Sequence, residues 1–165
     1  MEKEQENKPT SSFSNFGFRH NFVALNYMVE RNEIFPTGVA ALEFFVCFAI
    51  ASNLPYEPDI KKPWTGKGLK GSNESEKGYQ MAISTLSNRA DWLPPLVGYY
   101  CGGSEINRKI EYLANAGLHR FMEMVKNKFQ DTIDIENLIT HHTILEIMEE
   151  ILKENPIEDT SHQTV

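Results

Sequence analysis

A lysine-rich loop offers the densest set of side chains that could bind a ligand. It is the segment 60–71, IKKPWTGKGLKG, and it carries four lysines and a tryptophan: Lys61, Lys62, Trp64, Lys67 and Lys70. Glycine backbone, lysine ammonium groups and the N-terminus of a following helix can together hold an anion. The GxxxxGK[ST] motif is absent. The loop therefore predicts a phosphate-bearing ligand, against the alternatives of a solvated basic loop or docking on acidic residues.

A second group is the pair His141–His142 with Glu146. Residues four apart share a helix face, as two ligands of one metal ion must. Two ligands do not complete a site, and neither HExxH nor paired Glu-x-x-His motifs occur in the sequence. We therefore predict no metal and no cofactor here. The segment is interpreted as a polar helix junction, with a pH-sensitive contact as the alternative.

Glu43 is the single charged residue in the apolar run 39–51. A buried carboxylate has to be paired, hydrogen-bonded or protonated, and such groups are candidates for functional sites. A structural partner is the commoner outcome, with Arg19, Arg89 or Arg120 as the candidates. If Glu43 is functional, we expect a cleft beside it.

That cleft would include aromatic residues from the segment 89–103, RADWLPPLVGYYCGG. Trp92, Tyr99 and Tyr100 could stack a ligand or a base. The alternatives are core filling and a partner-binding patch. The sequence holds no GxSxG motif, no CxxC and no cysteine with a nearby histidine, so we predict no catalytic residue.

Apolar spacing predicts the helices that would position these groups. Residues 18–31 and 73–88 each show a helical apolar face, and Thr37 is a plausible N-cap for an entirely buried helix over about 37–53. The longest helix should run from Ser104 to about Phe129, with a short one after Pro94–Pro95. No strand alternation is convincing. We therefore predict an all-α, single-domain bundle of five to six helices around the buried apolar central helix at about 37–53.

The domain should extend over residues 13–155, between disordered tails at 1–12 and 156–165. Gly117 lies within the apolar face of the longest helix, which indicates close approach of a neighbouring helix. No apolar stretch reaches the roughly 20 residues of a membrane span. Two cysteines, Cys47 and Cys101, make no disulfide framework, so we expect a cytoplasmic protein.

The segment 134–155 shows two apolar faces on nearly opposite sides. Thr143 and Glu146 fit a capping box, so we predict a break at 141–143 and two helices, about 134–141 and 144–155. The alternative is one helix wedged between the core and a partner.

Charge is unevenly spread along the chain. Residues 131–165 hold nine acids and one base, a net charge of −8, whereas the other 130 residues hold 15 bases and 14 acids. The protein is thus a nearly neutral body with an acidic end, which disfavours nucleic acid or an anionic membrane as its main partner. Its composition, 41% hydrophobic and 24% charged, is that of a globular protein.

These patterns favour a non-catalytic protein that binds another macromolecule, as adaptors, immunity proteins and inhibitors do. The expected partner is another protein with a basic surface, and the alternative is self-association with a second copy of the chain. The predicted contact residues are four acids and three apolar anchors: Ile144, Glu146, Ile147, Glu149, Glu150, Ile151 and Glu154. The alternative is a small-ligand or nucleotide-binding protein, or an enzyme, that uses the loop 61–70.

Overall fold

The computed structural model describes residues 15–18, 25, 28–29, 34–57, 79–82, 90–129 and 139–156. Within them lie four helices and two strands: β1 (Asn15–Phe18), α2 (Gly38–Ala51), β2 (Tyr79–Ala82), α4 (Leu93–Cys101), α5 (Ile106–Lys128) and α7 (His141–Glu154). Most described residues are helical, so the predicted helical class is confirmed in this coarse form. The predicted number of five to six helices is not reached in the described part of the chain.

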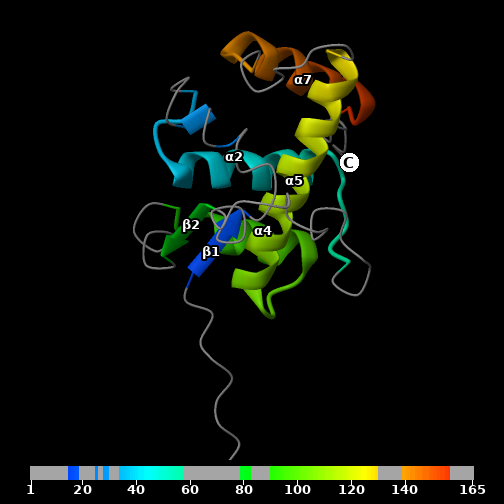
Figure 1. Cartoon of the computed structure of the whole chain (residues 1–165). Helices are drawn as coiled ribbons and strands as arrows, with labels where there is room; N and C mark the ends of the chain where they lie inside the picture. The colour runs from blue at the N-terminus through cyan, green and yellow to red at the C-terminus, as the bar shows by residue number, and fades with distance from the viewer. Residues whose placement is uncertain are drawn as a thin grey trace, which may run out of the picture.

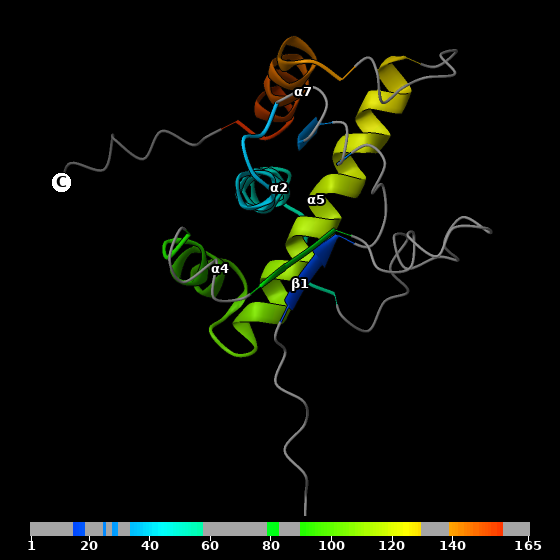
Figure 2. The same cartoon turned by 60° about the vertical axis from the view of Figure 1, so that its left-hand side comes forward.

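The helix α5 forms the axis of the arrangement. It has 23 residues and is therefore about 35 Å long. Both views show α4 beside its N-terminal end, α2 across its middle and α7 beside its C-terminal end (Figures 1 and 2). It packs against α2, α4, α7 and β1. The segment predicted to be the central helix, α2, is instead one of the helices that pack on α5.

The start of α2 follows the sequence prediction. Thr37 is the N-cap, and its hydroxyl accepts a hydrogen bond from the backbone N–H of Ala40 at 3.2 Å. Eight of its 14 residues are buried. The others form a half-exposed stripe with an exposed last residue: Ala40, Glu43, Phe44, Cys47, Ile50 and Ala51. The prediction that this helix is buried on all sides is therefore not confirmed, because these side chains are only partly buried.

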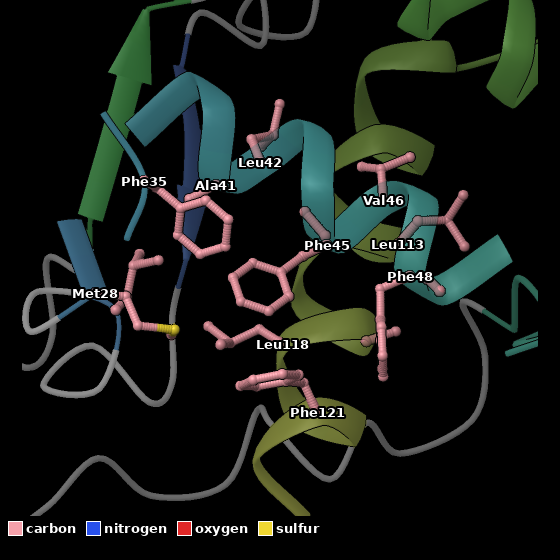
Figure 3. Packing of buried hydrophobic residues seen from close by; sticks show 14 of the residues in the cluster. Met28, Phe35, Ala41, Leu42, Phe45, Val46, Phe48, Leu113, Leu118 and Phe121 are labelled. Atoms are coloured by element: carbon pink, nitrogen blue, oxygen red, sulfur yellow. The ribbon is translucent and has the colours of Figure 1, made fainter. Parts of the chain in front are cut away.

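The core lies where α2 crosses α5. Phe45 of α2 and Phe121 of α5 are fully buried, and their ring centroids are 5.6 Å apart (Figure 3). The helices approach closely at Gly117, where a side chain would overlap the carbonyl oxygen of Phe45. The close helix approach predicted at this glycine is confirmed.

The two strands were not predicted. β1 pairs with β2 in antiparallel register, with Phe16 opposite Met81 and Phe18 opposite Tyr79. The helix expected over 73–88 is therefore wrong at residues 79–82, and the helix expected from 18 cannot begin at Phe18. The pairing joins segments about 60 residues apart, and local periodicity carries no information on such a contact.

Three further predictions concern the two tails, the helix over 18–31 and the absence of a membrane span. The proposed tails, 1–12 and 156–165, lie outside the described residues except for Pro156. Leu25 and Met28, from the helix predicted over 18–31, have helical backbone and are fully buried. No helix in the described ranges combines the length and apolar character needed to cross a membrane.

Candidate protein-binding surface

A threonine pair fixes the start of α7. The Thr140 hydroxyl accepts a hydrogen bond from the backbone N–H of Thr143 at 3.3 Å, and the Thr143 hydroxyl accepts one from the Thr140 N–H at 3.4 Å. This reciprocal pair is a capping box. The predicted box of Thr143 with Glu146 is wrong, because the helix begins at His141, three residues before the predicted start.

The chain is not helical immediately before α7. Thr140 has extended backbone, with φ −121° and ψ 170°, and Ile139 is also outside the helix. One continuous helix over 134–155 is thereby excluded. The first of the two predicted helices, 134–141, falls almost wholly outside the described residues.

The inner face of α7 belongs to the protein's own core. Ile144, Ile147 and Ile151 are 7%, 0% and 2% exposed. They recur at the spacing of one helix face, and α7 packs with that face against α5 and α2. The prediction that these three residues anchor a partner is therefore wrong in this structure, since their side chains are already covered.

Three of the four predicted partner-facing acids form ion pairs with α5. Lys128 Nζ lies 3.2 Å from Glu146 Oε2 and 3.1 Å from Glu150 Oε1. Arg120 Nη2 lies 3.7 Å from Glu154 Oε2. The hydrogen bonds that the Lys128 ammonium donates to the carboxylates of Glu150 and, to a lesser degree, Glu146 raise the pKa of Lys128. These three acids thus face cations of α5 rather than solvent alone.

A polar cleft follows the same ion pairs. It has a volume of about 310 Å³ and is lined by residues of both helices: Arg120, Met124, Asn127, Lys128, Glu150 and Glu154. Because its two cations already face carboxylates, the cleft offers little attraction to an added anion.

Glu149 differs from the other acids of α7. Its side chain is exposed, and no ion pair joins it to another residue in the described ranges. Of the four predicted contact acids, it alone presents its charge freely to solvent there.

The outer face of α7 carries an exposed apolar stripe. Leu145, Met148 and Leu152 are 59%, 39% and 46% exposed. Their spacing of i, i+3 and i+7 places them on one side of the helix. We call these three residues the outer stripe. The outer stripe adjoins Ile144, Ile147 and Ile151, and the six apolar residues together cover nearly half of the helix circumference, so they do not all reach the core.

Glu43 is half-buried rather than enclosed. Its carboxylate accepts a hydrogen bond from the indole N–H of Trp92 at 2.9 Å. The expected arginine partners do not fill this role: Arg120 pairs with Glu154 on α7, and Arg19 and Arg89 are outside the described residues. The contact with Trp92 ties the start of α4 to α2, which is a structural use of this carboxylate.

The aromatic residues of α4 divide into two groups. The Tyr100 hydroxyl donates a hydrogen bond to the backbone carbonyl of Leu54 at 2.7 Å, which joins the C-terminal end of α4 to the segment that follows α2. Trp92 and Tyr99 are 43% and 94% exposed. The predicted short helix after the prolines is present, beginning at Leu93 with Pro94 and Pro95 in its first turn.

A buried lysine joins α4 to α5. Lys109 is 6% exposed, and its ammonium donates hydrogen bonds to the carbonyls of Cys101 and Gly102 at 2.8 and 2.9 Å. These are the unpaired carbonyls at the C-terminus of α4, where a cation is favourable. Lys109 therefore acts as a helix cap and not as a free base.

The two thiols have weak nucleophilic character. Burial raises the pKa of Cys47, and the carboxylate of Glu43 raises it further. Burial also raises the pKa of Cys101, against an opposing effect of Lys109. Since the thiolate is the reactive form, neither environment activates its cysteine.

Two predicted sites remain: the lysine loop and the pair of His142 with Glu146. The lysine loop, with Lys61, Lys62, Trp64, Lys67 and Lys70, lies outside the described residues. His142 and Glu146 do share a helix face, and His142 Nε2 lies 3.2 Å from Glu146 Oε1. The described residues nevertheless contain no cluster of three metal-ligating side chains.

Comparisons with protein-family models, curated proteins and solved structures give no match for this chain. The described part of the chain is mainly helical, and its helix α7 packs on α5 and α2 along one face and carries exposed apolar side chains beside that face.

Proposed function

We propose that this protein is non-catalytic and acts by binding another protein through the outer face of α7, as adaptors, immunity proteins and inhibitors bind theirs. The observation that carries the proposal is the outer stripe. Three large apolar side chains at one helical spacing remain in solvent on α7, directly beside the face that is buried in the core. Exposed apolar groups of this kind mark interaction sites more often than single scattered residues do.

The packing of α7 supports this role. Its three buried isoleucines and its ion pairs to Lys128 and Arg120 hold the helix against α5. A surface fixed in advance loses less conformational entropy when a partner binds. We propose a cytoplasmic setting as well, supported by the two free cysteines.

The lysine loop remains the basis of a second prediction, a phosphate-bearing ligand. No contact among the described residues favours a phosphate-bearing ligand, so protein binding is the preferred proposal. Of the four acids predicted to face a partner, Glu146, Glu150 and Glu154 are paired with cations of α5. Glu149 is therefore the acid that would flank a partner bound to the outer stripe.

Paired substitutions test the proposal. We expect Leu145→Asp with Leu152→Asp to reduce capture of a partner from native cell extract by at least about tenfold, because two charges would enter the contact. The matched control is Tyr99→Asp, a charge placed on an exposed aromatic residue of α4. Quantitative mass spectrometry of the captured proteins measures the effect.

The control should retain the wild-type partner. Equal recovery of every captured protein by the α7 variant and the Tyr99 variant would contradict the proposal. So would capture lost only in the Tyr99 variant, which would place the contact on α4. Circular dichroism of each variant verifies that the helices are retained.

A further inference from the structure

Trp92 and Glu43 bring an indole ring and a carboxylate together where α4 begins beside α2. Glu43 Oε1 accepts the indole N–H at 2.9 Å, and Trp92 remains 43% exposed. The N–H is the one polar group of a tryptophan side chain, so the exposed part of the indole offers a ligand its π surface. The second carboxylate oxygen, Oε2, accepts no hydrogen bond from a described residue. No ion pair joins Glu43 to a described residue either, although the sequence predicted an arginine partner.

The charge around this pair favours a cation. The ranges 34–57 and 90–101, which contain α2 and α4, hold no basic residue and three acids: Glu43, Glu57 and Asp91. Asp91 directly precedes Trp92 and is exposed. An aromatic ring attracts a cation that lies within about 6 Å of its centroid, and a carboxylate beside the ring adds a charge-assisted hydrogen bond. An anionic ligand would be repelled here, and an apolar one would leave the carboxylate unused.

Arginine is the side chain that can use both groups at once. Its guanidinium is planar and weakly hydrated, so it stacks on an aromatic ring and still has N–H groups free to donate. Because Glu43 lies within hydrogen-bonding distance of the indole edge, a guanidinium stacked on Trp92 can donate to Oε2. A lysine ammonium is a compact, strongly hydrated charge and cannot stack in this way.

We propose that Trp92 and Glu43 form a binding site for an arginine side chain presented by another protein. A free arginine molecule fits less well, since its own carboxylate would approach Glu43 and Asp91. The site lies on α4 and α2, whereas the outer stripe lies on α7, so this inference goes beyond the proposed function and can fail independently of it. One cation–π contact and one hydrogen bond are weak by themselves, and we expect a dissociation constant of about 1–20 mM for a single capped arginine.

Titration with capped amino acids tests the site. The probe is N-acetyl-arginine amide, and the reporter is the indole N–H signal of Trp92 in an NMR spectrum of the isotope-labelled full chain. Trp64→Phe identifies this signal, because the chain has two tryptophans. We expect a saturable shift with the arginine probe. The citrulline analogue, which keeps the shape but carries no charge, should bind at least about fivefold more weakly.

Glu43→Gln separates charge from structure. The amide oxygen can still accept the indole N–H, so α4 stays joined to α2 while the negative charge is lost. We expect this variant to bind the arginine probe at least about threefold more weakly than the wild type. Glu123→Gln, which removes an exposed acid of α5, is the matched control and should bind the probe like the wild type. Thermal unfolding verifies that each variant is folded.

Four results would overturn the site. They are the absence of a saturable shift up to about 100 mM probe, equal affinity for the citrulline analogue, undiminished affinity in Glu43→Gln, and tighter binding of free arginine than of the capped form. The last of these would make a free amino acid the ligand in place of a protein side chain.

Discussion

Replacing Gly117 by alanine is expected to destabilise the protein by about 3 kcal/mol or more. A Cβ at this position would overlap the carbonyl oxygen of Phe45 and lie 2.9 Å from its carbonyl carbon and 3.3 Å from the backbone nitrogen of Ala49. These atoms belong to the backbone of α2 and cannot move as a side-chain tip can. Relief therefore requires the two helices to separate. Urea denaturation followed by circular dichroism measures the change in free energy of unfolding.

The sign of this effect is diagnostic. Alanine is a better helix former than glycine by about 1 kcal/mol, so without the close contact the substitution would stabilise α5. Gly98 in α4 is the matched control, since a Cβ there meets its nearest atom, Ile106 Cδ1, at 3.4 Å. We expect Gly98→Ala to be neutral or mildly stabilising. Equal stability changes for the two variants would contradict the described crossing of α2 and α5.

Phe121→Ala is expected to cost about 3–5 kcal/mol of stability, the usual range for a phenylalanine lost from a core. Phe121 is fully buried, and its ring meets three rings of α2: Phe44 at 6.2 Å, Phe45 at 5.6 Å and Phe48 at 5.7 Å between centroids. The substitution removes apolar burial and leaves a cavity among these rings. Denaturant unfolding measures the loss.

The control is an aromatic residue on a helix but outside the core. Tyr99 is 94% exposed, so Tyr99→Ala should change the free energy of unfolding by less than about 0.5 kcal/mol. A loss below about 1 kcal/mol for Phe121→Ala would show that the aromatic cluster does not hold α2 on α5.

The sequence predicted those parts of the fold that local patterns encode. Thr37 was recognised as a cap because its side chain serves a backbone N–H only three residues away. The apolar face of α5 was recognised from its spacing, and Gly117 was recognised because a glycine within such a face is costly unless a neighbouring helix requires it.

The strand pair shows where local reasoning ends. Tyr79, Ile83 and Leu86 have helical spacing, yet Tyr79–Ala82 pairs with Asn15–Phe18. Which extended segments meet is decided by tertiary contacts, and strand propensity depends strongly on that context. A single sequence therefore gave the helical class and missed the sheet.

Three of the contact residues predicted on α7 lie in the core of the structure. Periodicity showed that Ile144, Ile147 and Ile151 share a side of α7, but it does not show whether that side meets the core or a partner. The acids were misread for a similar reason. Their neutralisation by Lys128 and Arg120 depends on how α5 and α7 pack, and this is a tertiary property.

A methyl spectrum of the protein in native cell extract tests most directly whether a partner docks on the outer stripe. With labelled methionine methyl groups and about 5 µM protein, Met148 on the stripe can be compared with Met122, which is 2% exposed in the core. We predict that the Met148 signal shifts or loses intensity relative to Met122 in extract, and that it recovers in the variant with Leu145→Asp and Leu152→Asp. A Met148 signal with the same position and relative intensity in extract as in buffer would contradict binding at this surface.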